Sequence, residues 1–93
     1  MLQSENYMKI QEVLLNYIKG TYESHIPLLR SCFHESAKMT GYLGDTLVDG
    51  TPEPFFEDMA SGPSMALGKE PYEAEIQFIH ITGRTASAAV HET

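Results

Sequence analysis

The sequence contains little of the chemistry used in disulfide-rich, nucleic-acid-binding or membrane-bound proteins. Its 93 residues include one cysteine and no tryptophan. One cysteine cannot form an internal disulfide, which favours a reducing cytoplasm as its location. Six basic residues against thirteen acidic ones give a net charge of -7. A surface this acidic repels phosphate backbones and anionic lipid, so we expect neither nucleic acid nor a membrane as a partner.

Long hydrophobic runs are also missing. The apolar stretches are far shorter than the about 20 residues that a membrane-spanning helix needs. The opening segment, MLQSENYMKIQE, lacks the basic start and apolar centre of a secretion signal. The length and a hydrophobic content of 42% allow one small globular domain with a modest core. We predict a single domain over residues 1–93.

The first third of the sequence has the spacing of two helices. In SENYMKIQEVLLNYIKG the apolar residues recur every three or four positions and form one stripe. We predict a helix with Ser4 as its N-cap and Gly20 as a left-handed residue that ends it. A second, shorter helix is predicted to start at Ser24. Pro27 is compatible with it, because proline is tolerated in the first turn of a helix.

The middle of the sequence alternates between turn and helix signals. AKMTGYLGDTLVDG mixes polar and apolar residues at short period, which predicts two short strands joined at Gly44 and Asp45. Thr51 as N-cap and Pro52 at the first helical position predict a helix over TPEPFFEDMA. Residues 61–71, which are interrupted by glycine and proline, are predicted to form a loop.

The last third carries the strongest strand signals. YEAEIQFIHIT and RTASAAVHE flank Gly83 and Arg84, and together they predict a long β-hairpin. Apolar residues occupy both faces of the first strand after Gln77. This pattern indicates either a strand covered on both sides or a β-bulge.

The order of helix, helix, strand pair, helix and hairpin is an α+β plan. It comes with the segments YIKGTYES, CFHESAKMTGYLGDTLVDGTPEPFFEDM and IHITGRTASAAVHE. Together these resemble the nuclear transport factor 2-like superfamily (NTF2-like), and within it the lumazine-binding branch beside the SnoaL-like cyclases and ketosteroid isomerases. The resemblance implies a cystatin-like α+β barrel, in which a cone-shaped, curved antiparallel sheet wraps around the N-terminal helix and leaves a pocket at its wide end.

The resemblance also has consequences for assembly. The family typically continues with two more strands, often including a tryptophan, whereas this sequence ends at AVHET. We therefore expect a barrel truncated at the C-terminus, with an unpaired strand edge over residues 85–92 that can pair with another chain. Because proteins of this plan commonly dimerise through the outer sheet face, we expect a homodimer or a larger homo-oligomer.

Cys32, His34 and Glu35 lie close together in CFHESAKM. Residues two apart at a helix end point in divergent directions, which is poor geometry for a thiol and its base. As zinc ligands they lack a fourth group at a familiar spacing. We expect Cys32 and Phe33 to pack in the core while His34 and Glu35 face water, and we expect no metal and no cofactor.

Two residues are candidates for acid–base catalysis. Ketosteroid isomerases and the cyclases use a cavity aspartate or a His–Asp pair, so the resemblance directs attention to such groups. His80 shares a predicted strand face with Ile76 and Phe78, where a histidine can serve as a cavity acid or base. Asp45 is the second candidate, although aspartate also favours turns for backbone reasons. A structural role stays open for both.

Aromatic side chains are the candidates for binding a small molecule. An apolar pocket typically has aromatic walls and a few hydroxyl groups that fix the ligand's orientation. The hydroxyls of Tyr17, Tyr42 and Tyr72 can reach a ligand, and each of these rings can equally be core. The predicted ligand-binding residues are Tyr17, Phe33, Tyr42, Phe56 and Phe78.

Three functions follow from this sequence, and the fold alone does not choose among them. The first is a domain that binds a small apolar or aromatic molecule in an apolar pocket without catalysis. The second is an isomerase, cyclase or dehydratase that uses a pocket histidine as acid or base. The third is an oligomerising interaction protein that pairs through its exposed strand edge. We favour the first, because the residues offer no convincing catalytic pair.

Overall fold

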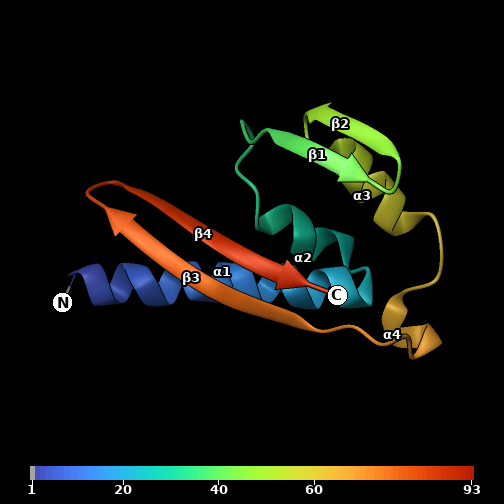
Figure 1. Ribbon diagram of the computed structural model, residues 1–93, viewed down its shortest axis with the longest axis horizontal. Coiled ribbons are helices and arrows are strands. Elements are labelled where there is room, and N and C mark those ends of the chain that lie inside the picture. Colours follow the sequence, from blue (N-terminus) through green and yellow to red (C-terminus); the bar gives the residue numbers. More distant parts are fainter. Residues whose placement is uncertain (1) are drawn as a thin grey trace.

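The structure, a computed structural model, describes residues 2–93, and their side chains from Glu5 onward. The helices and strands, in chain order, are α1 (Leu2–Glu23), α2 (Ile26–Ser31), β1 (Met39–Leu43), β2 (Thr46–Gly50), α3 (Glu53–Ala60), α4 (Met65–Gly68), β3 (Ala74–Thr82) and β4 (Thr85–Glu92). Figure 1 shows α1 as a long rod with the β3–β4 hairpin running along it, and α2, α3 and the β1–β2 hairpin gathered at its C-terminal end. The α+β class predicted from the sequence is confirmed.

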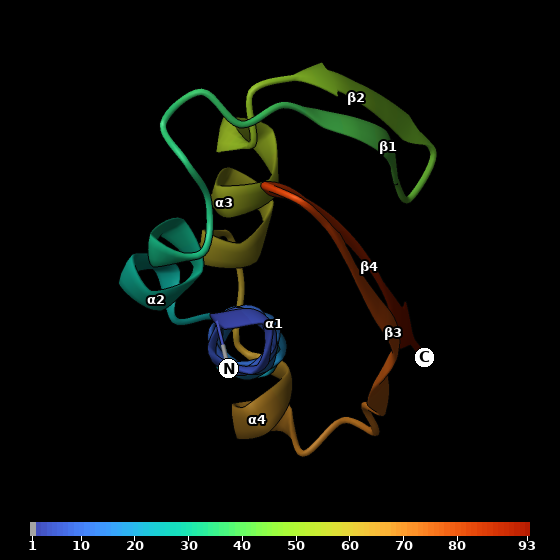
Figure 2. The same ribbon diagram turned by 90° about the vertical axis from the view of Figure 1, so that its left-hand side faces the viewer.

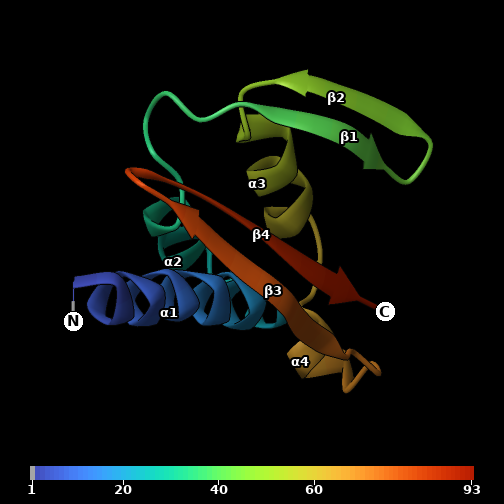
Figure 3. The same cartoon turned by 60° about the vertical axis from the view of Figure 1, so that its left-hand side comes forward.

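The described strands form two separate antiparallel hairpins, β1–β2 and β3–β4. Viewed along α1, both hairpins curve around the helices, with α1 and α3 on their inner side (Figure 2). Figure 3 shows the β1–β2 hairpin at one end of α3 and the β3–β4 hairpin crossing in front of α1. Within residues 2–93, β4 pairs with β3 alone, so its other edge is unpaired.

Helix α1 extends past Gly20, which was predicted to end it. A Cβ atom added at Gly20 would lie 2.9 Å from the Leu29 Cγ, so this glycine lets α2 approach α1 closely. The left-handed conformation occurs instead at Ser24, with a φ of 52°. The prediction for Gly20 was wrong because a sequence does not distinguish a glycine that ends a helix from one that admits a neighbouring helix.

Helix α2 begins two residues later than predicted. The Nδ1 atom of His25 accepts a hydrogen bond from the backbone N–H of Leu28 at 3.1 Å, so His25 is the N-cap and the helix starts at Ile26. Pro27 lies in the first turn, as predicted. This short helix places Leu29, which is fully buried, against α1.

The β1–β2 hairpin turns at Gly44 and Asp45, as predicted, and pairs Met39 with Gly50 at its far end. Helix α3 follows, with Pro52 at the N-cap and the Thr51 hydroxyl accepting a hydrogen bond from the backbone of Glu53 at 3.4 Å. The sequence predicted Thr51 as the N-cap, one residue earlier.

Residues 61–71, predicted to be a loop, contain the single-turn helix α4. The Ser64 hydroxyl caps it by accepting from the backbone N–H of Leu67 at 3.0 Å, and Lys69 ends it in the left-handed conformation. A helix of four residues is too short to show a hydrophobic period in the sequence, so this element was missed.

The β3–β4 hairpin contains a bulge. Ile76 pairs with Val90 and Phe78 pairs with Ala89, which leaves Gln77 without a partner on β4. A bulge switches the faces of the residues that follow. Ile76 therefore faces α1 before the bulge, and Ile79 and Ile81 are the half-buried residues after it. The bulge alternative from the sequence is confirmed.

The core lies where α1, α2 and α3 meet. Leu29, Phe55 and Phe56 are buried, and Tyr17 and Phe33 pack against them. The Phe33 and Phe56 rings meet edge to face, with centroids 5.4 Å apart, and Tyr17 stacks on Phe55 at 6.1 Å. Such ring pairs add to the energy of apolar burial. This aromatic cluster packs α3 against α1 and α2.

Candidate functional site

A hollow of about 280 Å³ lies between α1, the β1–β2 hairpin, α3 and the end of β4. The residues that line it come from segments far apart in the sequence, from Tyr17 on α1 to Glu92 on β4. The lining residues are Tyr17, Thr21, Met39, Thr40, Gly41, Tyr42, Leu43, Val48, Phe55 and Glu92. Tyr17 and Thr21 lie one helical turn apart on α1, so both face the same way.

One side of the hollow is apolar. Met39, Gly41 and Leu43 alternate along β1 and therefore share a face, and Gly41 pairs with Val48 on β2. An added Cβ at Gly41 would meet nothing within 4 Å, so the wall is open at this point. Phe55, a member of the aromatic cluster, closes the back.

The other side of the hollow is polar and is built around Glu92. The Tyr72 hydroxyl donates a hydrogen bond to Glu92 Oε1 at 2.6 Å. Strand pairing fixes Glu92 opposite Ala74, and the backbone N–H of Thr93 continues the ladder by donating to the Glu73 carbonyl at 2.9 Å. Glu92 is therefore positioned by strand pairing of its backbone and by a hydrogen bond to its side chain.

The Glu92 carboxylate contributes to raised pKa values of two tyrosine hydroxyls. Burial, and then the negative charge of Glu92, raise the pKa of Tyr17 above its ordinary value of 10.0. Burial and the hydrogen bond to Glu92 raise the pKa of Tyr72 in the same direction and further. Both hydroxyls thus carry their protons at neutral pH and can act as hydrogen-bond donors.

Thr21 completes the polar side. It is 7% exposed and lines the hollow, and within the described residues its Oγ1 atom has no hydrogen-bond partner. Most buried hydroxyl groups in proteins are paired with a protein atom or a bound molecule. A hydroxyl in this position is available to a molecule that enters the hollow.

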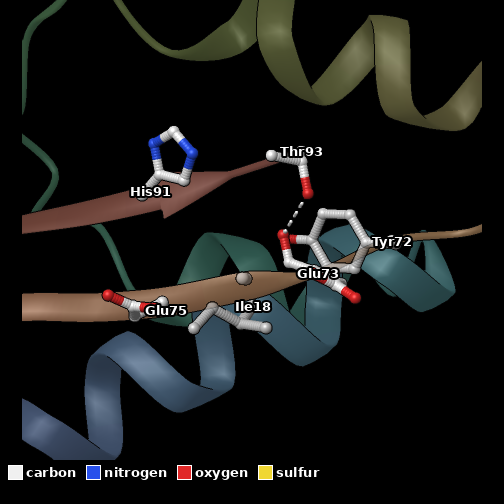
Figure 4. A pocket seen from close by; sticks show the side chains of 7 residues that line it. Ile18, Tyr72, Glu73, Glu75, His91 and Thr93 are labelled. Carbon is white, nitrogen blue, oxygen red and sulfur yellow. Dashed lines mark hydrogen bonds between the residues drawn. The ribbon is translucent and has the colours of Figure 1, made fainter.

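A larger groove of about 660 Å³ is lined by Tyr72 and by residues at the ends of β3 and β4. Figure 4 shows Glu75 and His91 extending from neighbouring strands and a hydrogen bond between Thr93 and Glu73, with Ile18 beneath them. Glu73, Glu75, His91 and Thr93 are all exposed. Thr40, Tyr42 and Glu92 of the hollow are exposed as well, but the hollow is backed by the buried side chains of Thr21, Val48 and Phe55, whereas none of the residues that line the groove is buried.

The five residues predicted to bind a ligand are distributed over three environments. Tyr17 and Tyr42 line the hollow. Phe33 and Phe56 belong to the aromatic cluster behind its wall. Phe78 is 53% exposed and lies beyond the bulge, on the face of β3 opposite Ile79.

The two residues predicted to act as acid and base lie on different hairpins. His80 is exposed on the outer face of β3, and its Nε2 atom lies 3.3 Å from the Thr82 hydroxyl. Asp45 is exposed in the β1–β2 turn. Neither lines the hollow, whose titratable groups are Tyr17, Tyr42 and Glu92. A catalytic role for His80 or Asp45 stays a prediction.

Cys32 is part-buried at the end of α2. Its Sγ lies 3.4 Å from the Leu28 carbonyl oxygen and 3.5 Å from that of Val13 on α1, and burial raises the pKa of the thiol. His34 is exposed, and its Nδ1 accepts from the backbone N–H of Ser36 at 3.0 Å. In residues 2–93 no three His, Cys, Asp or Glu side chains are arranged to hold a metal ion.

Glu92 and Thr21 are the two site residues that sequence reasoning missed. Thr21 could have been found, because it follows Tyr17 by four residues on the same helix. Glu92 could not, because its position depends on which face of the β3–β4 hairpin is turned inward, and the bulge at Gln77 cannot be located from the sequence. Tyr72 was recognised as a source of a hydroxyl, but its partner was not.

The comparisons with known proteins agree with the fold. Two solved structures are similar to this chain, and both are NTF2-like proteins of unknown function. The protein from Shewanella baltica has 27% identity and a TM-score of 0.79, and the match covers 97% of this chain and 71% of that chain. The protein from Methylobacillus flagellatus has 26% identity and a TM-score of 0.78, and the match covers 95% of this chain and 68% of that chain. No curated protein matches the sequence. None of the helices in residues 2–93 combines the length and hydropathy needed to cross a bilayer.

The sequence was also compared with protein families. Residues 5–93 match the family described as "Putative lumazine-binding". This match spans nearly the whole chain, and it agrees with both structural neighbours and with the order of helices and strands. The chain therefore belongs to this family, within the nuclear transport factor 2-like superfamily.

Proposed function

We propose that this protein binds a small, flat, apolar or aromatic molecule in the hollow beside Tyr17, without a catalytic step of its own. The observation that carries the proposal is the division of the hollow into an apolar wall and a polar side. Ligand sites in proteins typically combine such walls with a few polar groups that fix orientation. The wall comes from Val48, Phe55 and neighbouring residues, and the polar groups are Thr21 and Glu92.

The family description names lumazine, a fused two-ring compound with two carbonyl groups. Lumazine is flat and has both apolar ring edges and hydrogen-bonding groups, so it fits the character of the hollow. We therefore use lumazine as the test compound for binding.

Blocking the hollow provides the test. Val48 is 6% exposed and lines the hollow, whereas its neighbour Leu47 is 57% exposed and points to the other face of β2. A phenylalanine at position 48 fills the hollow, and one at position 47 leaves it open. Calorimetric titration with lumazine is expected to show binding in the wild type and in Leu47→Phe, and little or none in Val48→Phe.

Circular dichroism serves as the control that both variants fold. If Val48→Phe is folded and binds lumazine as the wild type does, the hollow is not the binding site. Equal loss of binding in Leu47→Phe would equally contradict the proposal, because that side chain does not reach the hollow.

A second candidate function is assembly through β4. Its outer edge is unpaired within the described residues, and the strand, TASAAVHE, has neither lysine nor proline to discourage pairing. We infer a homodimer in which two β4 edges pair. Light scattering during size-exclusion chromatography is expected to give twice the monomer mass, and a clean monomer at all concentrations would contradict this inference.

A further inference from the structure

The edge of β4 that β3 leaves unpaired within residues 2–93 presents a definite set of backbone groups. Glu73 and Thr93 exchange hydrogen bonds in both directions, with N to O distances of 2.9 and 3.4 Å. In an antiparallel ladder such bonded pairs alternate with unbonded ones, and the extra residue of the bulge lies on β3, so the alternation continues along β4. The residues of β4 whose backbone N–H and C=O groups point away from β3 are therefore Ala86, Ala88, Val90 and Glu92.

This edge is accessible over the first half of β4. Thr85, Ala86, Ser87 and Ala88 are all exposed. In the described part of the chain, β3 is the one element that packs closely along β4. A further strand can therefore reach the outward backbone groups without displacing another element.

A second copy of β4 can supply that strand. Two identical strands related by a two-fold axis pair antiparallel, and the residues whose backbone groups point outward must lie opposite each other. An axis through Ala88 satisfies this condition. Ala88 then lies opposite the same residue of the partner, and Ala86 lies opposite the partner subunit's Val90.

Charge selects this register over its neighbours. Each chain has a net charge of -7, so two copies repel each other unless opposite charges meet at the interface. Of the lysine, arginine, aspartate and glutamate residues, the segment 83–93 contains Arg84 and Glu92. With the axis at Ala88, Arg84 lies opposite the partner subunit's Glu92, and the symmetry forms this pair twice. Moving the axis by one residue in either direction separates the two charges.

Glu92 can accept this additional partner. Its side chain is exposed, and the Tyr72 hydroxyl occupies one of its acceptor positions, at Oε1. A carboxylate can accept about four hydrogen bonds, and the guanidinium group of an arginine can donate two of them side by side. Arg84 is also exposed, so both side chains are accessible before the subunits meet.

We propose that two copies of this chain join through β4 in this register, with Arg84 of each copy paired with Glu92 of the other. Because Glu92 lines the hollow, the partner subunit's Arg84 lies at the rim of the hollow, and each binding site contains a residue from both subunits. This inference rests on the assembly put forward as the second candidate function and specifies how the two strands meet.

Cysteine cross-linking measures the register. In a Cys32→Ala background, single cysteines are placed at positions 86, 87, 88, 89 and 90 and oxidised mildly. Directly opposite residues of a bonded pair have Cα atoms about 5.5 Å apart, which a disulfide can span. Ala88→Cys is therefore expected to give a covalent dimer on a non-reducing gel. Ala86→Cys and Val90→Cys, each about 14 Å from its own counterpart, are expected to cross-link when mixed and not alone.

Reversing the charges tests the ion pair. Arg84→Glu is expected to raise the dissociation constant of the dimer roughly 10-fold at low salt, because it replaces both attractive pairs with repulsive ones. Glu92→Arg is expected to have a similar effect, and the double variant is expected to restore the affinity. Lys38→Glu, which makes the same charge change at an exposed residue outside β4, is the control and is expected to change the constant less. Light scattering over a concentration series measures the constant, and thermal unfolding shows that each variant is folded.

The outcomes distinguish this inference from the proposed assembly. The strongest cross-linking at a position other than 88 would show that the β4 edges pair in a shifted register, so the assembly would be right and the inference wrong. A double variant that stays as weak as the single ones would contradict the ion pair. A monomer at every concentration, or a dimer that cross-links at none of these positions, would contradict the assembly and the inference together.

Discussion

The two halves of this molecule are stabilised in different ways. In the half formed by α2, α3 and the β1–β2 hairpin, the structure buries Leu29, Val48, Phe55 and Phe56. In the β3–β4 hairpin, by contrast, every described apolar side chain is at least partly exposed. The first half is stabilised by packing of its buried side chains. The second half is stabilised by the backbone hydrogen bonds between β3 and β4 and by the packing of one face of β3 against α1. A small protein with one compact core can thus hold a long hairpin as an outer wall.

The hollow lies at the junction of these two halves. Val48 and Phe55 come from the packed half, Glu92 comes from the hairpin, and Tyr17 comes from α1 between them. Elements with few buried contacts open at lower free energy than the core does. The apolar wall of the site is therefore the more rigid part, and the Glu92 side the more adjustable one.

The largest expected effect follows from removing the centre of the packed half. Leu29 is fully buried between α1 and the aromatic cluster. Leu29→Ala is expected to lower the free energy of unfolding by about 2–5 kcal/mol, since a large-to-small core change leaves a cavity. Urea denaturation measures this loss. Leu67→Ala, at a leucine that is 81% exposed, is the control and should stay within about 0.5 kcal/mol of the wild type.

The second prediction concerns the contact between α1 and α2. A methyl group at Gly20 would lie 2.9 Å from the Leu29 Cγ, and overpacking of this kind costs about 1–3 kcal/mol. The better helix propensity of alanine offsets about 1 kcal/mol of this cost. Gly20→Ala is therefore expected to be destabilising by about 1 kcal/mol in the same urea assay. Stabilisation would show that the two helices are not this close.

The third prediction tests the hairpin half and its bulge. Ile79 faces α1 and is half-buried, whereas its neighbour Phe78 is 53% exposed on the opposite face. Ile79→Ala is expected to cost about 1 kcal/mol, a fraction of what a fully buried isoleucine costs. Phe78→Ala, which deletes a larger side chain, is expected to cost less. The reverse order would mean that β3 continues without the bulge at Gln77.

The smallest effect is a dependence on pH. Because the folded state raises the pKa of Tyr72 above 10.0, it binds the phenolic proton more tightly than the unfolded chain does. The stability that this contributes is fully present below the unfolded pKa of about 10 and is lost as the pH rises above it. Chemical denaturation from about pH 8 to 11 should show a decline that is shallower in Tyr72→Phe. Equal slopes would show that the Tyr72 hydroxyl does not contact Glu92.

Much of the fold could be predicted from the sequence because its signals are local. Gly44 and Gly83 mark turns between strands, Pro27 marks the first turn of α2 and Pro52 marks the N-cap of α3, so the order of these elements follows from short stretches. The close approach at Gly20 could not be predicted, since it depends on α2 packing against α1. Helix α4 was missed because one turn carries no hydrophobic period.

The site was predicted less completely than the fold. Tyr17 and Tyr42 line the hollow, but Tyr42 is 72% exposed on the outer face of β1, and a ligand-binding role for either stays a prediction. Glu92 and Thr21 were not predicted. Their significance comes from contacts between segments about 70 residues apart, and one unpaired residue at the bulge decides which β3 side chains face inward.

One measurement tests the central claim, ligand binding in the hollow, most directly. In nuclear magnetic resonance titrations with lumazine, we predict that the backbone amide signals of Thr21, Gly41, Val48 and Glu92 shift together and saturate. These residues are far apart in sequence and meet only around the hollow. Shifts confined to the outer face of β3, around Phe78 and His80, or the absence of any shift, would contradict the claim.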